Sequence, residues 1–231
     1  MPFALHPATI DDAPSIAAIF QAAFANDHIM SHFYPNVPAS ILWEKDVKFY
    51  HDLIAQDGIY GERIIKAVDE ESGDTGSKAV AFAAWQYPHT LTEEQKRAKE
   101  AKSGSNRDKP PEDSNKPLIK EFFAQLLAGR KRWIVPEETF FLHILAVHPT
   151  YHRRGLGTTL IRTGLEAADK AGAQTYIEAS PAGLPLYLRH GWEQVDEMVI
   201  DMGAYGGQGI EHQPFLMRKP GAGSKLGGAE G

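Results

Sequence analysis

A glycine-bearing loop between an apolar strand and a long helix is the part of this sequence best suited to chemistry. The stretch AVHPTYHRRGLGTTLI puts Gly155 and Gly157 at the start of a predicted helix. The first backbone N–H groups of a helix have no partner inside it and lie at the positive end of its dipole. A phosphate can accept several hydrogen bonds there, and glycines let it approach the backbone closely. With Arg153 and Arg154 at its rim, the loop is predicted to bind a phosphate or pyrophosphate.

The spacing of these glycines does not fit the two best-known nucleotide loops. A Rossmann loop needs three glycines and an acidic residue further on, and a P-loop needs Gly-Lys-Ser/Thr. Neither pattern is present. An isolated Gly-Leu-Gly can instead serve only to shape a strand-to-helix turn. The residues around it must therefore distinguish a binding loop from a plain turn.

Those surroundings resemble the coenzyme A-binding segment of GNAT acetyltransferases. The segment LAVHPTYHRRGLGTTLI is similar to the family pattern Arg/Gln-x-x-Gly-x-Gly/Ala after a strand that ends in Val-x-Pro, although His152 replaces the usual Gln or Arg. Downstream, SPAGLPLYLRHGWE is similar to a second family landmark, with Tyr187 shortly before Gly191 and Trp192. The resemblance implies an acyl-coenzyme A-dependent N-acyltransferase, with acetyl-coenzyme A as co-substrate and no metal.

The resemblance also implies roles for individual residues. In the family, a central strand splays from its neighbour at a bulge, where free N–H groups hold the pantetheine and polarise the thioester carbonyl. Tyr187 matches the general acid that protonates the coenzyme A sulfur. The implied cofactor site consists of Leu145, Ala146, Val147, His152, Arg153, Arg154, Gly155, Leu156, Gly157 and Thr158.

The catalytic base stays open among three residues. The strand FLHILAVH resembles one of arylalkylamine acetyltransferases in which histidines act through water, and the match falls on His143, whereas a second histidine of that family corresponds to Phe141. Strand alternation predicts that His143 shares a face with Phe141 and Leu145, and an imidazole suits proton removal near neutral pH. A packed core histidine is an equally good interpretation. Glu178 and Glu138 are the alternative carboxylate bases.

The acceptor pocket is expected to be aromatic. We expect it between the loop after the first helix, the strand that ends in WQY, and the final hairpin. Its candidate residues are Phe24, Phe33, Tyr34, Trp85 and Tyr87, with Asp27 or Glu178 to hold an ammonium group. Core packing explains any one of these aromatics as well. A small-molecule amine is the favoured acceptor; the alternatives are a protein N-terminus or lysine, and a non-catalytic acyl-coenzyme A sensor.

Apolar periodicity predicts the scaffold that positions these residues. Strand patterns cover residues 3–8, 59–70, 77–87, 139–147, 174–180, 192–201 and 213–218, and helical patterns include 40–56, 156–171 and 184–189. Together they predict an α/β fold: a mixed, mostly antiparallel sheet of about seven strands flanked by helices, in the element order of the GNAT fold. The almost wholly apolar TFFLHILAV is expected at the centre of the sheet.

Composition and charge set the remaining expectations. With 231 residues and 42% hydrophobic content, the chain is expected to form one domain over 1–218, with an insertion at 88–136 and a disordered Gly-rich tail at 219–231. Residues 88–135 hold 11 Lys+Arg against 7 Asp+Glu, a charge of +4, whereas the whole chain carries -6. The insertion is therefore basic, its Gly/Ser/Pro-rich centre is expected to be mobile, and the body is acidic.

Several function classes are excluded by the same numbers. A net charge of -6 argues against a nucleic-acid partner, and the absence of cysteine removes disulfides, thiolate zinc sites and a cysteine nucleophile. The N-terminus, MPFALHPATIDDAPSIAAIF, fits neither a signal peptide nor a membrane span, so we expect a soluble, cytoplasmic protein with no membrane partner. A monomer and a homodimer are both compatible with the sequence.

Overall fold

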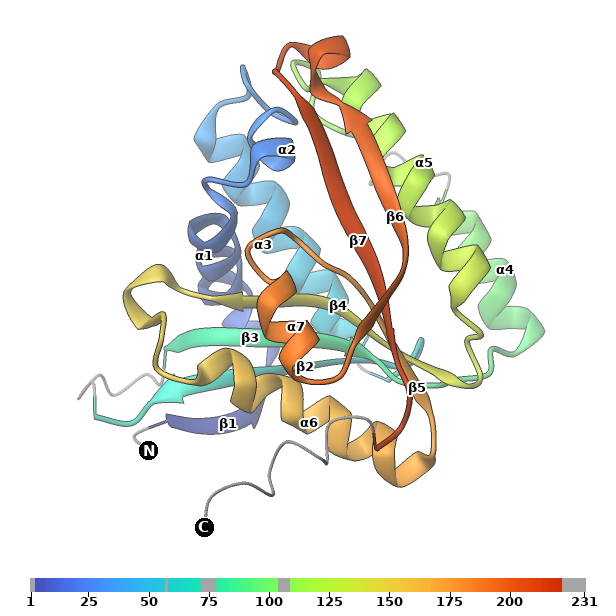
Figure 1. Ribbon diagram of the computed structural model, residues 1–231. Coiled ribbons are helices and arrows are strands. Elements are labelled where there is room, and N and C mark those ends of the chain that lie inside the picture. Colours follow the sequence, from blue (N-terminus) through green and yellow to red (C-terminus); the bar gives the residue numbers. More distant parts are fainter. Residues whose placement is uncertain (1–2, 57, 72–77, 104–108, 222–231) are drawn as a thin grey trace.

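The computed structural model describes residues 3–56, 58–71, 78–103 and 109–221 (Figure 1). Its strands are β1 (Phe3–Pro7), β2 (Glu62–Asp69), β3 (Ala79–Gln86), β4 (Thr139–Val147), β5 (Gln174–Glu178), β6 (Glu193–Asp201) and β7 (Ile210–Arg218). Its α-helices are α1 (Ala13–Phe24), α2 (His28–Ser31), α3 (Ala39–Ala55), α4 (Glu93–Ser103), α5 (Lys116–Trp133), α6 (Leu156–Ala171) and α7 (Leu184–Arg189). The centre of the insertion (104–108) and the tail from 222 onward lie outside the described residues.

The seven strands form one mixed sheet in the order β1-β2-β3-β4-β5-β7-β6. Every neighbouring pair is antiparallel except β4 and β5, which are parallel. The predicted mixed, mostly antiparallel sheet is therefore confirmed, and the apolar strand β4 lies at its centre. Its burial on both faces explains why its sequence shows no apolar–polar alternation.

The sheet opens between β4 and β5. The parallel pairing joins Thr139–Leu142 to Gln174–Ile177 and goes no further, because β5 ends at Glu178 while β4 continues to Val147. Ala179 then donates its N–H to the carbonyl of Pro214, so the chain after β5 follows β7 instead of β4. Figure 1 shows β6 and β7 rising steeply away from β1–β4. Within the part of the chain that the structure describes, the C-terminal half of β4 is consequently left with one edge that has no partner strand.

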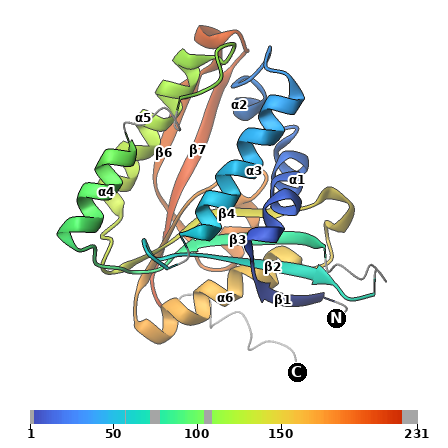
Figure 2. The ribbon, with the colours of Figure 1, turned by 180° about the vertical axis from the view of Figure 1, so that it is seen from behind.

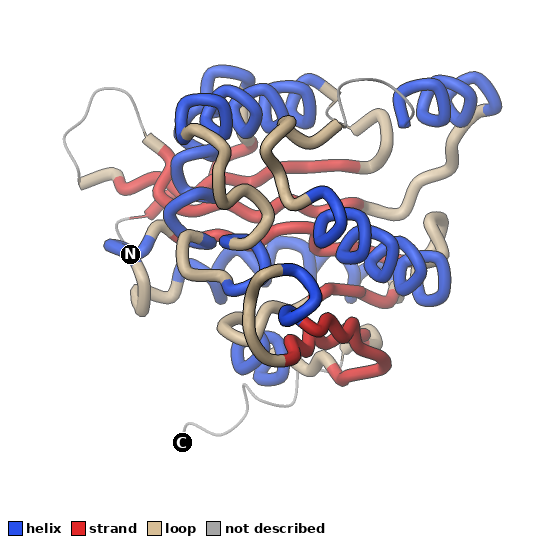
Figure 3. Tube along the Cα trace, turned by 90° about the horizontal axis from the view of Figure 1, so that it is seen from above, coloured by secondary structure: helices blue, strands red, loops and turns tan. Residues whose placement is uncertain are grey.

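Helices cover both faces of the sheet. One buried cluster joins β2–β5 to α6 and α7, and a second joins the opposite face of β2–β4 to α1 and α3 (Figures 1 and 2). In the view from above, strands lie between helices on either side (Figure 3). The contact between α6 and the sheet is very close at Gly164, where an added Cβ would lie 2.2 Å from Cε2 of Trp85. Glycine at this position lets α6 pack directly on the Trp85 indole.

The insertion between β3 and β4 packs onto the other half of the sheet through α5. Leu118, Phe122 and Leu126 of this helix are buried in a third cluster with residues of β5, β6 and β7. Gly129 lies so close to Phe215 that an added Cβ would be 2.3 Å from the ring. At the other end of α5, Asn115 donates Nδ2–H to the carbonyl of Tyr205. The second part of the basic segment is therefore anchored by both apolar and polar contacts.

Two positive charges of α5 pair with carboxylates of the acidic body. Arg130 contacts Glu178 at 2.7 Å, and Arg132 contacts Asp196 at 3.1 Å. The uneven charge of the sequence thus serves, at least in part, to attach the insertion to its own sheet. Within the described residues, no helix combines the length and the apolar character needed to cross a bilayer.

Candidate active site

A cavity of about 620 Å³ lies where β4 and β5 separate. Its walls come from the end of α1, the end of β4, the loop into α6, and the segment around α7. The lining residues are Ala23, Phe24, Leu145, Ala146, Val147, Tyr151, His152, Arg153, Gly155, Leu156, Gly157, Thr158, Ser180, Ala182, Gly183, Leu186, Tyr187 and Arg189. Every predicted cofactor residue except Arg154 lines this cavity; the Arg154 guanidinium instead lies over the ring of Tyr151, 4.9 Å from its centroid.

A β-bulge interrupts β4 at His143. Ala84 of β3 pairs with Ile144, but the next residue, Trp85, pairs with Leu142, so His143 is the extra residue. The bulge resets the alternation of side chains along the strand. Phe141 and His143 share a face, with ring centroids 4.0 Å apart, whereas Leu145 packs with the cluster around α6. The prediction that Leu145 lies on the same face as His143 is therefore wrong.

Two backbone donors of β4 point to the open edge. The N–H of His148 donates to the carbonyl of Val80 on β3, at 2.9 Å. Because N–H groups alternate in direction along a strand, that of Ala146 also points to β3, while those of Leu145 and Val147 point to the side from which β5 has departed. Of the three residues predicted to polarise a thioester, only Leu145 and Val147 can offer N–H donors to the cavity. Ala146 lines the cavity without offering a donor.

The loop between β4 and α6 presents free helix N–H groups to the same cavity. Gly155 is the N-cap of α6 with φ 80°, and Arg153 also has a positive φ of 62°. The first N–H inside the helix to find a helical partner is that of Thr159, which donates to the carbonyl of Gly155. Those of Leu156, Gly157 and Thr158 are therefore available to an anion.

The His152 side chain fixes this loop to the end of β4. Its Nε2 lies 2.9 Å from the carbonyl oxygen of Val147. A carbonyl only accepts, so Nε2 carries the proton and donates. This contact accounts for a histidine where the resembled pattern has Gln or Arg: the ring ties the loop to the end of β4.

Glycine substitutions in the loop are expected to weaken acetyl-coenzyme A binding. Gly155→Glu forces a side chain into the left-handed region, and in Gly157→Glu the new Cβ would lie 3.1 Å from Cδ2 of Leu186. Either change should raise the dissociation constant, measured by calorimetry, by at least tenfold, about 1.4 kcal/mol.

The matched control is Gly172→Glu at the other end of α6. Gly172 has a similar φ of 64° and open space around it, so this variant carries the same backbone strain away from the cavity. It should bind acetyl-coenzyme A as the wild type does. Unchanged affinity in folded Gly155 and Gly157 variants would remove the loop from the binding site.

Tyr187 reaches the cavity from α7. Its ring packs edge-on against Trp192, with centroids 5.8 Å apart, and against Gly183, where an added Cβ would lie 2.8 Å from Cε2. The side chain is buried, and this burial raises the pKa of the phenol well above its usual value. Tyr187 therefore keeps its proton at neutral pH and can donate it.

The two alternative carboxylate bases lie elsewhere. Both oxygens of Glu178 accept hydrogen bonds from Arg130, at 2.7 Å each, so this carboxylate is held in an ion pair away from any amine. Glu138 is exposed and precedes β4 at the end opposite the cavity, about 23 Å from Leu145 at the rise of an extended strand. Of the three candidates, His143 lies nearest the start of the opening, directly after the last β4–β5 pair, but it is not among the residues that line the cavity.

The predicted acceptor aromatics do not meet in one pocket. Trp85 is buried beneath α6, and Tyr87 packs on Phe140 of the same face, 4.8 Å between centroids. Phe33 is buried on the opposite face against Phe122 of α5, and Tyr34 lies beside it. Alternation along β3 directs Trp85 to the α6 face, which corrects its predicted place. Among these aromatics, only Phe24 lines the cavity.

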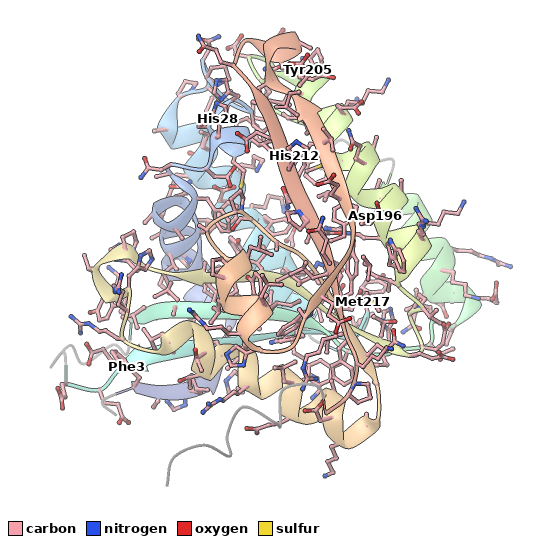
Figure 4. All side chains as sticks on the ribbon, in the orientation of Figure 1. Phe3, His28, Asp196, Tyr205, His212 and Met217 are labelled. Atoms are coloured by element: carbon pink, nitrogen blue, oxygen red, sulfur yellow. The ribbon has the colours of Figure 1, made fainter. Side chains whose placement is uncertain are left out.

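Two further histidine–carboxylate contacts join α2, β6 and β7, among residues that do not line the cavity. His28 of α2 contacts Glu211 of β7 at 2.6 Å, and His212 contacts Glu197 of β6 at 3.1 Å (Figure 4). Asp27 accepts a hydrogen bond from the N–H of Met30 as the N-cap of α2, so it is already engaged. Among the described residues, no group of three or more acidic or histidine side chains is placed to hold a metal.

Seven cavity residues were not identified from the sequence: Ala23, Tyr151, Ser180, Ala182, Gly183, Leu186 and Arg189. Ser180, Leu186 and Arg189 belong to the segment SPAGLPLYLRHGWE, in which the sequence analysis singled out only Tyr187, Gly191 and Trp192. Arg189 lies two residues after Tyr187, and its positive charge suits contact with an anionic ligand.

Comparison with known proteins finds matches for both the sequence and the fold. Residues 120–192 match the model of the Acetyltransferase (GNAT) family. The structure is similar to mosquito arylalkylamine N-acetyltransferase-like 5b, with a TM-score of 0.60 at 16% identity, covering 94% of this chain and 99% of that one.

One bacterial and one archaeal structure are similar as well. The first, described as histone acetyltransferase HPA2 and related acetyltransferase, comes from Corynebacterium glutamicum, with a TM-score of 0.57 at 18% identity over 95% of this chain and 97% of that one. The second is the PaiA N-acetyltransferase of Thermoplasma acidophilum in complex with coenzyme A, with a TM-score of 0.51 at 12% identity over 95% and 99%. At these identities the likeness is one of fold.

Proposed function

Because the chain is a GNAT acetyltransferase that uses an acyl-coenzyme A, we propose that it transfers the acetyl group of acetyl-coenzyme A to the primary amine of a small molecule. The observation that supports this best is the convergence of three features on one cavity. The free edge of β4, the N-terminus of α6 and the Tyr187 phenol all line it. They match what direct acyl transfer needs: a polarised carbonyl, a held pyrophosphate and a proton for the leaving thiolate.

The reaction follows from these positions. The pyrophosphate lies on the N–H groups of Leu156, Gly157 and Thr158, and the pantetheine runs along the open edge of β4. The base first takes one proton from the ammonium form of the substrate, which makes the amine neutral. The neutral amine attacks the thioester carbonyl, and the N–H groups of Leu145 and Val147 stabilise the oxyanion. When the intermediate collapses, the C–S bond breaks, Tyr187 gives its proton to the sulfur, and the nitrogen releases its second proton to solvent.

We assign the base to His143, acting through water. It lies at the bulge of β4, directly after the last pair with β5, and outside the residues that line the cavity, so water would carry the proton to it. A neutral imidazole can take a proton near pH 7. Glu178, the main alternative, is committed to Arg130.

A small acceptor is favoured over a protein by the contact between α2 and the β6–β7 end of the sheet, which leaves less surface for a protein to approach. Ile29 and Phe33 of the α2 region are buried in one cluster with Met202, and His28 contacts Glu211. The pairing of Arg130 and Arg132 with body carboxylates also removes two charges from any docking surface for a protein. A protein amine remains the second candidate, since one similar fold is described as a histone acetyltransferase.

A parallel panel of acceptors tests this proposal. Arylalkylamines, polyamines and aminosugars would be compared with peptides that present a free N-terminus or a lysine, and coenzyme A release would be followed over the hydrolysis background. We expect the highest kcat/KM with a small amine. Preference for peptides would favour the protein acceptor. Tight binding of acetyl-coenzyme A without release above background in any reaction would favour the sensor.

A further inference from the structure

The Arg130 side chain of the insertion helix α5 contacts the point where the sheet opens. Its Nε and Nη2 each donate to a different oxygen of Glu178, both at 2.7 Å. The Glu178 side chain is 6% exposed and that of Arg130 29% exposed. Glu178 is the last residue of β5, immediately after the pairing with β4 ends. The ion pair therefore fixes the backbone at the start of the opening.

The same guanidinium also lies over the ring that supports His143. Cζ of Arg130 is 4.8 Å from the centroid of Phe141. The Phe141 ring in turn stacks on the His143 imidazole, at 4.0 Å between centroids and 33° between planes. Phe141 is 1% exposed and packs against Tyr176 of β5, so it has little room to move. Arg130, Phe141 and His143 thus form a continuous row of stacked groups.

His143 needs this support because of its place in the strand. A bulge residue lies outside the regular ladder, so its side chain is oriented less by strand pairing than by the groups packed on it. A guanidinium suits both contacts: its planar fork binds a carboxylate with two parallel hydrogen bonds and its face covers an aromatic ring. The ammonium of lysine can do neither in the same geometry.

We propose that Arg130 is a positioning residue of the active site: it holds Glu178 and Phe141 so that the His143 imidazole keeps the orientation needed to remove the amine proton. This proposal rests on the assignment of His143 as base in the proposed function. It gives the insertion a role in catalysis that does not require contact with either substrate.

The test replaces Arg130 by lysine, which keeps the charge and loses the fork. Arg130→Lys should lower kcat about tenfold, because a small misplacement of a catalytic group is costly, while KM for acetyl-coenzyme A stays within about twofold. Arg132→Lys is the matched control. Arg132 lies two residues further along α5, also pairs with a carboxylate of the sheet and stacks on Trp133, but is 68% exposed and away from His143. It should keep wild-type kcat.

A double-mutant cycle distinguishes positioning of His143 from a general structural effect. In the His143→Ala background, Arg130→Lys should change kcat by less than about twofold, since the group that it positions is gone. An equal loss in both backgrounds, or wild-type kcat in Arg130→Lys, would overturn the proposal. If His143→Ala itself keeps full activity, the base assignment fails instead, and the two failures are distinguishable.

A second variant covers the case in which Arg130→Lys does not fold. The double variant Arg130→Met, Glu178→Gln removes both charges and so leaves no unpaired buried carboxylate. It keeps the stem of the side chain over Phe141. It should show the same loss of kcat, and the same insensitivity in the His143→Ala background. Wild-type kcat in this variant would equally contradict a positioning role.

Discussion

Tyr187→Phe is expected to lower turnover by about 10²-fold or more, with little change in the affinity for acetyl-coenzyme A. The substitution keeps the ring that packs against Trp192 and Gly183 and removes only the hydroxyl. Burial raises the pKa of this phenol, so the wild-type group is protonated over the whole range in which the enzyme would be assayed. Steady-state coenzyme A release gives kcat, and calorimetry gives the dissociation constant.

The matched control for this experiment is Tyr50→Phe. Tyr50 is also a buried tyrosine whose pKa is raised by burial, but it belongs to α3, packs on Phe82 of β3 and does not line the cavity. This variant should retain wild-type kcat. Full activity of Tyr187→Phe would mean that water protonates the leaving thiolate, and that the side-chain mechanism reduces to positioning and backbone polarisation.

His143→Ala should cause a loss that depends on pH. Between about pH 6 and 7.5 most of an aliphatic amine is protonated, so the rate should fall by about 10²-fold when the base is removed. At higher pH the amine loses its proton unaided, and part of the lost rate should return. The ratio of wild-type to variant kcat/KM, measured across this range with one amine, should therefore decrease as pH rises.

The control for this profile is His51→Ala. His51 is an exposed residue of α3 beside Asp52, outside the cavity, so the variant should follow the wild-type profile. Wild-type rates of His143→Ala across about pH 6 to 9 would show that His143 is not the base. A loss that stays constant with pH would point to a packing role for the imidazole.

Structural features that depend on a short stretch of sequence were predictable. The seven strands and the helices over 40–56, 156–171 and 184–189 follow from apolar periodicity, and the loop at Gly155 follows from glycine spacing. Each of these signals lies within one short window of the chain. The cavity brings together nearly all residues of the predicted cofactor site, because that site was built on one strand, one turn and one helix.

The register of β4 against β3 could not be predicted in the same way. The bulge at His143 depends on how Ala84 and Trp85 pair with a strand that follows them only after the whole insertion. Simple alternation therefore placed Leu145 on the wrong face. The resemblance implied backbone donors at Leu145, Ala146 and Val147, and the alternation of N–H groups in the structure directs only those of Leu145 and Val147 to the open edge.

Residue type was also a poor guide where long-range packing decides the environment. Glu178 has the chemistry of a base, but its partner Arg130 lies 48 residues earlier in the chain. Trp85 has the chemistry of an acceptor pocket, but Gly164 on α6 provides the surface on which it packs. Neither contact leaves a local pattern. The predicted acceptor aromatics other than Phe24 thus lie outside the cavity, and most of them pack in the core.

Transfer of label from acetyl-coenzyme A is the most direct measurement of what this cavity does. With acetyl-labelled substrate and an amine from the panel, the label should appear in the amine, one acetyl group for each coenzyme A released. Without amine, it should stay in acetyl-coenzyme A, and none should remain on the protein, because the amine attacks the thioester directly. Label retained on the protein, or tight binding with no transfer to any amine, would contradict direct acetyl transfer at the opening between β4 and β5.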